Sequence, residues 1–145
     1  VGILVNNLKN LREVGRMAVY SYDAKETTVV VDGRYITAFD EGTMVEWSKD
    51  EENFAAKIDA QGAVGVAKRN NTLGTLTINL MQTSPDLAFL KKLANTNKEF
   101  AVWVQNKSEK VGATRAMVKK TPDGSFGDEL EARSIEIQLF DMVDQ

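Results

Sequence analysis

Cysteine and histidine are both absent from this 145-residue sequence. Without cysteine the chain has no disulfide scaffold and no thiol nucleophile, and without histidine it cannot form a Ser-His-Asp triad. Zinc sites in proteins are built mostly from these two residue types, so we expect no metal site. These absences exclude several large classes of enzyme, and we expect no cofactor.

Long hydrophobic runs are missing as well. No apolar segment reaches the roughly 20 residues that a membrane-spanning helix requires. The opening segment Val1–Val5 is too short for the hydrophobic region of a signal peptide, and it is followed by two asparagines. We therefore expect neither a targeting segment nor a membrane partner.

The charge balance is mildly acidic, with 18 basic and 21 acidic side chains and a formal net charge of −3. Proteins that bind nucleic acids usually present a basic surface to phosphate, so this balance is not typical of them. The length suits one domain with its own core. We expect residues 20–145 to form that domain and residues 1–19 to form an N-terminal arm or short helix.

Alternation of apolar and polar residues predicts a mainly β fold. Segment 27–31 is β-branched and ends at Asp32-Gly33, which is typical of tight hairpin turns, so residues 34–39 would be the returning strand. The clearest half-buried strand pattern is 73–81, and residues 133–141 alternate in the same way. Further strand candidates are residues 44–48, 54–59, 100–104 and 112–118.

One helix is indicated after the strand 73–81. Ser84 is predicted as its N-cap, Pro85 as its first residue, and Asp86 suits the positive end of the helix dipole. Asn95 and Asn97 are the predicted terminators. The fold class that follows is an antiparallel β-sandwich or partly closed barrel, with one flanking α-helix and a long extended loop.

The long loop is residues 53–72, which combine small residues and scattered charges with no aromatic residue after Phe54. A compact domain rarely spends so many residues on a connection unless the segment is functional. We interpret it as a segment that becomes ordered against another molecule. The predicted subunit-contact residues are Asp50, Glu51, Glu52, Asn53, Phe54, Lys57, Asp59, Gln61, Lys68, Arg69, Asn70 and Asn71, with Trp47 as a further interface candidate.

Motifs for catalysis or phosphate binding are weak. Carboxylates cluster at residues 50–52 and 128–131, but such runs are usually solvated, and no partner base stands out. Gly62, Gly65 and Gly74 precede a strand, whereas the glycines of a phosphate-binding loop precede a helix. We predict no catalytic residues and no cofactor-binding residues.

Two segments together resemble a known family. Residues 29–42 combine a strand, an Asp-Gly-Arg hairpin and a glycine break, and residues 71–85 join a strand to the predicted helix through Gly-Thr-Leu-Thr-Ile-Asn-Leu-Met-Gln-Thr-Ser-Pro. With the long segment between them, they are similar to the tail tube proteins of contractile-tailed bacteriophages, phage structural proteins formerly labelled a domain of unknown function. The resemblance covers roughly residues 20–143, and residues 74–85 are its most specific part.

The resemblance implies a non-enzymatic structural protein of the virion, made in the host cytoplasm. Six copies would form a ring, and rings would stack into a hollow tube through which DNA passes without specific binding. A contractile sheath would surround the tube, and a baseplate initiator would start its growth. Residues 50–71 would contact an adjacent ring, and their basic pair would face acidic residues of the neighbour; the residues concerned are Lys68 and Arg69 with Asp128, Glu129 and Glu131.

Three alternatives stay open at this point. The same fold resembles the tube subunits of contractile bacteriocins and of secretion systems, which would place the chain in a different particle. A small β-barrel ligand-binding protein would instead be a monomer with an enclosed apolar pocket. An enzyme would require carboxylates gathered in a cleft.

Overall fold

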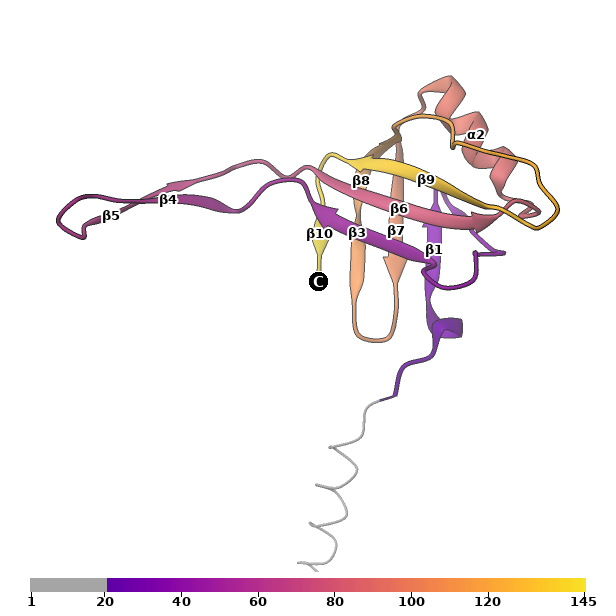
Figure 1. Cartoon of the computed structure of the whole chain (residues 1–145), viewed down its shortest axis with the longest axis horizontal. Helices are drawn as coiled ribbons and strands as arrows, with labels where there is room; N and C mark the ends of the chain where they lie inside the picture. The colour runs from indigo at the N-terminus through magenta and orange to yellow at the C-terminus, as the bar shows by residue number, and fades with distance from the viewer. Residues whose placement is uncertain (1–20) are drawn as a thin grey trace, which may run out of the picture.

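The computed structural model describes residues 21–145, which form a mainly β structure, as the sequence predicts. One antiparallel sheet has the strand order β2-β1-β7-β8-β9-β6-β3, with β10 paired to β8 (Figure 1). Its strands are β1 Thr28–Val31, β2 Arg34–Tyr35, β3 Val45–Lys49, β6 Gly74–Met81, β7 Phe100–Gln105, β8 Lys110–Val118, β9 Ala132–Leu139 and β10 Val143–Asp144. A short 3-10 helix, η1 Ala24–Glu26, precedes β1. The predicted N-terminal arm or helix, residues 1–19, lies outside the described residues.

The sheet bends at β8, which belongs to both of its halves. The first part of β8 pairs with β7, and its end, from Ala116 to Val118, pairs with β9. In Figure 1 the strands β3, β6 and β9 cross in front of β1, β7 and β8. The two terminal strands of the order, β2 and β3, are not paired with each other, so the sheet stays open rather than closing into a barrel.

The core lies between the two halves and is built by strict alternation. Along one face of β6, Leu76, Ile78 and Leu80 are fully buried, and the residues between them are half-buried. The strand β9 alternates in register with it, because Ile78 faces Ile135 and Leu76 faces Ile137. A period of two therefore places one face of each strand in the core, as the sequence predicts.

A single α-helix, α2 Leu87–Thr96, occurs among the described residues. Its buried residues are Leu87, Leu90 and Leu93, and it packs against β8. The helix begins two residues later than predicted, with Asp86 in place of Ser84 as its N-cap. The shift arises because residues 84–86 form a turn of their own, in which the Ser84 hydroxyl accepts a hydrogen bond from the Asp86 amide at 3.3 Å.

Of the two residues predicted to end the helix, the structure confirms Asn97 as its C-cap. Asn97 has a left-handed backbone, with φ 51°, and its N–H reaches back to the last turn of the helix. Asparagine is among the few residues that accept this conformation. Asn95, the other predicted terminator, lies inside the helix.

The hairpin at Asp32-Gly33 forms as predicted, but its second strand is much shorter than the expected 34–39. Both turn residues have positive φ, at 51° and 79°, which is the geometry of the favoured tight turns. The strand β2 ends at Tyr35, and just beyond it the Thr37 amide donates to the Asp86 carboxylate at 2.7 Å, which ties the following segment to the start of α2.

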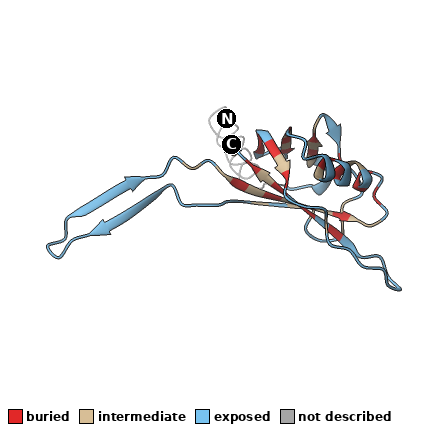
Figure 2. Cartoon of the chain, turned by 90° about the horizontal axis from the view of Figure 1, so that it is seen from above, coloured by how far each residue is buried: buried red, intermediate tan, exposed pale blue. Residues whose placement is uncertain are grey.

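The expected long loop is an ordered β-hairpin, made of β4 Phe54–Ile58 and β5 Val64–Lys68. We call Phe54–Lys68 the arm and the other described residues the body. The arm prolongs β3 and β6 away from the body, and all ten residues of its two strands are exposed (Figure 2). The extended shape agrees with the sequence interpretation, whereas its pairing within the chain was not predicted.

Two glycines of the sheet provide a matched test of the packing. A Cβ at Gly112 would overlap the backbone oxygen of Val102, whereas a Cβ at Gly74 would meet only the flexible side chain of Met142. We expect Gly112→Ala to lower the free energy of unfolding by about 2 kcal/mol, and Gly74→Ala to cost clearly less. Urea denaturation of both variants measures this difference, and equal losses would contradict it.

Candidate assembly surfaces

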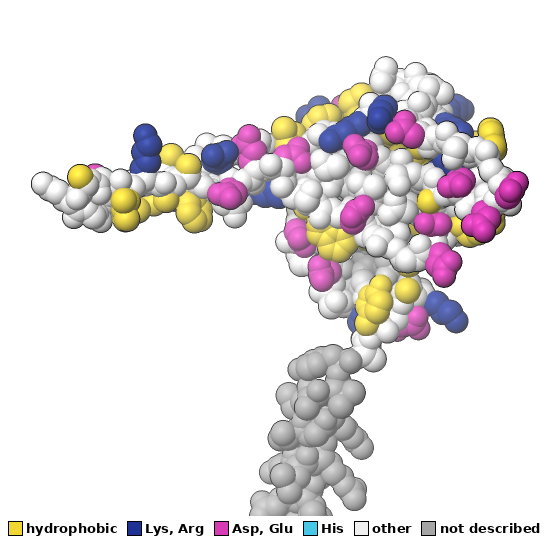
Figure 3. Space-filling model, in the orientation of Figure 1, with side chains coloured by type: hydrophobic (Ala, Val, Ile, Leu, Met, Phe, Trp, Pro, Cys, Tyr) yellow, Lys and Arg dark blue, Asp and Glu magenta, His cyan; other side chains and the backbone are white. Residues whose placement is uncertain are grey.

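The arm has one apolar face. The cross-strand pairs Ala56–Val66 and Ile58–Val64 lie on the same side as Phe54, because residues that face each other across a ladder share a side of the sheet. We call Phe54, Ala56, Ile58, Val64 and Val66 the apolar arm face. Phe54 is 54% exposed and Ile58 is 72% exposed. Figure 3 shows apolar side chains along the arm, with nothing of the body against them.

The opposite face of the arm carries small residues. Ala55 pairs with Ala67, and Lys57 pairs with Gly65. An isolated two-stranded hairpin is at best marginally stable in water, and this one has no buried residue of its own. The arm therefore has the composition of a segment that is stabilised by covering its apolar face with another molecule.

The tip of the arm is a turn organised by Asp59. Its carboxylate accepts hydrogen bonds from the amides of Gln61 and Ala63, both at 2.8 Å. Gly62 supplies the positive φ, 89°, that this turn requires. Two of the predicted contact residues, Asp59 and Gln61, therefore shape the tip of the arm.

The root of the arm is fixed to the body by Asp50. Its carboxylate accepts from the Thr75 hydroxyl at 2.8 Å and from the Gln138 amide at 3.1 Å. The hydrogen bond from Gln138, followed by that from Thr75, lowers the pKa of Asp50. A charged carboxylate thus joins the segment before the arm to β6 and β9, whereas a contact of Asp50 with a neighbouring subunit stays a prediction.

Two further contacts stiffen the same region. Arg69 donates to Glu51 at 3.2 Å, and Lys49 donates to Asn53. The Arg69–Glu51 pair is exposed, and such pairs contribute little to stability. In this structure Arg69 is therefore already close to an acidic partner of its own chain, whereas the contact with acidic residues 128–131 of a neighbour stays a prediction.

The structure gathers the predicted contact residues along one projection but adds others. Residues 50–53 and 69–71 lie at the root, whereas Phe54, Lys57 and Lys68 lie on the strands. Sequence reasoning passed over the apolar residues Ile58, Val64 and Val66. The alternating valines of Val64-Gly-Val66 were the available signal, but the glycine between them and the alanine on either side are poor strand formers.

A groove opens on the body where the sheet fails to close. It has a volume of about 400 Å³ and lies between β3 and the neighbouring ends of β7 and β8. Val104 and Val111 are buried at its floor, and Trp47, a predicted interface residue, is half-buried in its wall. The full lining is Tyr22, Ala24, Thr27, Gly42, Thr43, Met44, Val45, Trp47, Val104, Asn106, Ser108, Glu109 and Val111, which we call the groove.

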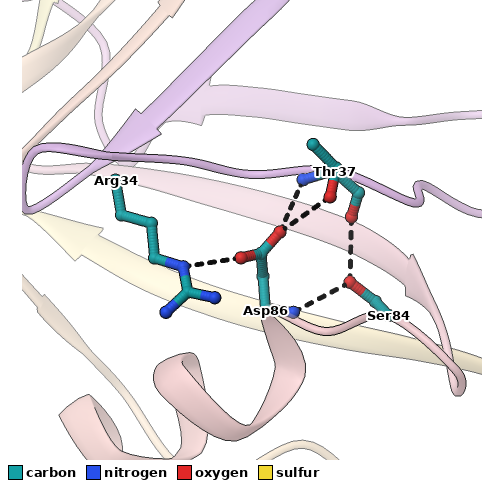
Figure 4. Close-up of polar contacts among 4 residues, drawn as sticks. All are labelled: Arg34, Thr37, Ser84 and Asp86. Carbon is teal, nitrogen blue, oxygen red and sulfur yellow. Dashed lines mark hydrogen bonds and ion pairs between the residues drawn. The ribbon is translucent and has the colours of Figure 1, made fainter.

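The strand-to-helix junction contains a buried carboxylate, Asp86, which is only 3% exposed (Figure 4). It accepts from Arg34 Nε at 2.7 Å, from the Thr37 amide at 2.7 Å and from the Thr37 hydroxyl at 3.0 Å. Burial alone would raise the pKa of this carboxyl, but the hydrogen bonds from Thr37 and Arg34 outweigh it and lower the pKa. The Ser84 hydroxyl completes the cluster by donating to the Thr37 carbonyl at 2.9 Å.

The junction cluster is structural in character. Its side chains tie the segment after β2 to the start of α2, and Arg34 also lies over the ring of Phe89 at 5.0 Å. Within residues 21–145 no group of three or more acidic side chains is arranged to hold a metal ion. The helix of the described chain is too short and too polar to cross a membrane.

Comparisons with known proteins give the chain its family. The model of the bacteriophage PhiTE tail tube protein family matches residues 17–134. No curated protein sequence matches the chain.

Solved structures with a similar fold come from contractile injection systems. The sheath/tube terminator of the extracellular contractile injection system PVC, in its extended state, is 11% identical, with a TM-score of 0.61, covering 88% of this chain and 98% of that one. The tube-terminating cap of the anti-feeding prophage is 12% identical, with a TM-score of 0.60, covering 88% and 92%.

A chain of the PVC sheath-tube complex in its extended state is 13% identical, with a TM-score of 0.60, covering 90% of this chain and 96% of that one. Identities this low show the fold alone. The family model covers most of the sequence, including the hairpin, the arm and the junction. The chain therefore belongs to the bacteriophage PhiTE tail tube protein family and is a tail tube-like structural protein.

Proposed function

We propose that the chain is the repeating subunit of a hollow tail tube, built from hexameric rings that stack on one another. The observation that carries this proposal is the arm, which projects from the body with every strand residue exposed and an apolar face uncovered. A surface of this kind marks an interaction site. The unpaired sheet edges at β2 and β3 support ring formation, because neighbours that join edge to edge remove exposed strand edges.

We infer that the tube conducts DNA without binding it. The face of the sheet away from the core carries short polar side chains, and its two charged residues in the register Glu46–Thr77–Glu136 are both acidic. A neutral or acidic lining repels phosphate and favours sliding, whereas a basic lining would hold it. The remaining polar residues of these strands on this face are Ser48, Thr75, Asn79, Ser134 and Gln138, and the Lys119 ammonium from the end of β8 donates to Thr75 at 3.2 Å, beside the carboxylate of Asp50.

The partners follow from the same proposal. A contractile sheath surrounds the tube, a baseplate initiator starts its growth, and the assembled product is part of a virion whose subunits are made in the host cytoplasm. The subunit performs no catalysis in this scheme. A contractile bacteriocin or secretion-system tube is the related alternative, favoured by the solved structures of injection systems with the same fold. Neighbouring capsid and portal genes would distinguish a phage from these particles.

Electron microscopy of the purified protein across a concentration series tests the proposal. We expect rings at low concentration and hollow tubes as the concentration rises, because head-to-tail contacts between identical subunits grow into open assemblies. Tubes of uniform diameter would support the proposed function. Monomers at every concentration, even after addition of preformed tail tubes as seeds, would contradict it.

A further inference from the structure

No residue of the body, as described for 21–145, covers the apolar arm face. The arm continues the line of β3 and β6 away from the body, and Figures 1 and 2 show it extended in both views. Val64 and Val66 are 60% and 58% exposed. Burying such side chains contributes roughly 25 cal/mol per Å² of apolar surface removed from water, so a partner surface of matching chemistry is strongly favoured.

The groove is a matching surface. Met44 and the β3 residues Val45 and Trp47 form one apolar wall above the buried floor. Tyr22 stands at its rim, 76% exposed. A volume of about 400 Å³ lies in the range of pockets that bury small apolar ligands, so the groove has room for side chains of a ribbon rather than for its backbone. Tryptophan and tyrosine are also the residues that most often anchor protein interfaces.

The charges of the two surfaces are complementary. Of the two lysines on the arm strands, Lys68 pairs with Phe54 and so lies on the side of the apolar arm face, whereas Lys57 pairs with Gly65 on the opposite face. The charged residue in the groove lining is acidic, Glu109, and is opposite in sign to Lys68. Charge complementarity of this kind fixes the register of a contact and disfavours the pairing of two like surfaces.

We propose that the apolar arm face of one subunit docks into the groove of a second copy of this chain. The proposal rests on the proposed tube function and deepens it, because it names the acceptor for the arm. The contact joins two different surfaces, so each subunit offers one arm and one groove. Such head-to-tail contacts propagate from copy to copy, as a growing assembly requires.

Cross-linking tests the proposal in a chain that has no native cysteine. The variant Val66→Cys with Thr43→Cys places one thiol on the apolar arm face and one on the groove lining. The matched control is Ala67→Cys with Thr43→Cys, because neighbouring residues of a strand point to opposite faces. Assembled protein is treated with a short bis-maleimide and separated on a denaturing gel, with electron microscopy of the same samples.

We expect a ladder of dimers, trimers and longer products for the first variant, and its loss in the control and in each single variant. Equal ladders for both arm positions, or no ladder in samples that contain tubes, would overturn the docking while leaving the tube function intact. Dimers from Val66→Cys alone would show that two arms pair with each other, which also overturns it. A Thr43→Cys thiol that stays unreactive in free subunits would show that the subunit's own residues fill the groove, with the same consequence. Failure of the proposed function would be seen separately, because electron microscopy of the same samples would then show no tubes.

Discussion

Replacing the arm by a two-residue turn is expected to abolish tube assembly while leaving a folded subunit. The design joins Asn53 to Arg69 through Asn-Gly. These residues are already hydrogen-bonded across the ladder, with the Arg69 amide donating to the Asn53 carbonyl at 2.8 Å. Asn-Gly is the preferred loop for closing such a hairpin, because both of its positions accept positive φ. The turn therefore fits the ends that the arm leaves behind.

The subunit should stay folded because the arm contributes no residue to the core. Urea denaturation should give a free energy of unfolding close to that of the full chain, and electron microscopy should show no tubes at any concentration. A control with Ala55→Ser and Ala67→Ser alters only the face of small residues and should still assemble. Long tubes from the armless subunit would refute the role that we assign to the arm.

Asp86→Asn is expected to lower the free energy of unfolding by about 2 kcal/mol at neutral pH, because it removes a buried carboxylate that accepts hydrogen bonds from Thr37 and from the half-exposed Arg34. Asp86 accepts three hydrogen bonds, from Arg34 and Thr37. In the variant one carboxylate oxygen becomes an amide that donates toward groups that also donate. Urea denaturation at pH 7 measures the loss.

The loss should depend on pH in a definite direction. The folded-state pKa of Asp86 is lowered below its unfolded value of about 3.9, so its contribution to stability is fully present above that value. The contribution is lost as the pH falls through the folded pKa. The difference in the free energy of unfolding between the original chain and Asp86→Asn should therefore become smaller below about pH 4. Asp123→Asn, at an exposed carboxylate 3.8 Å from Lys120, is the control and should show little effect at either pH.

Much of the sheet could be predicted from the sequence, because local alternation decides it. The buried set Leu76, Ile78 and Leu80 lies where a period of two places it. The tight turn at Asp32-Gly33 has the predicted backbone because aspartate and glycine are among the residues that favour its positive φ. In these elements the local preference of the chain and the tertiary structure agree.

The shortened strand after that turn could not be predicted from its own residues. Residues 34–39 have a strand-like composition, but the segment is redirected by Asp86, nearly fifty positions further along the chain. A contact over that distance leaves no trace in local periodicity. The turn of residues 84–86, whose Ser84 hydroxyl also binds the Thr37 carbonyl, likewise makes α2 begin after Asp86 rather than at the predicted Pro85.

The sequence indicated where the candidate interaction segment lies, but not that its exposed surface is apolar. The length and composition of residues 53–72 indicated an interaction segment, and the charged residues were chosen as its contacts. The hairpin pairing brings Ile58 opposite Val64 and so joins the apolar sides of the two strands into one face. The groove has a similar origin, because Trp47 and Val111 meet only when the sheet bends at β8.

The continuity of the arm with the sheet has a mechanical consequence. A pull on the arm along its axis passes through residues 50–53 and 69–73 into β3 and β6, parallel to both strands. The hydrogen bonds of an antiparallel sheet lie perpendicular to its strands, so such a load shears many of them at once instead of opening them one by one. The strand β6 shares that load with β9 on its other side. A tube held together by such arms would resist stretching with the strength of its sheets.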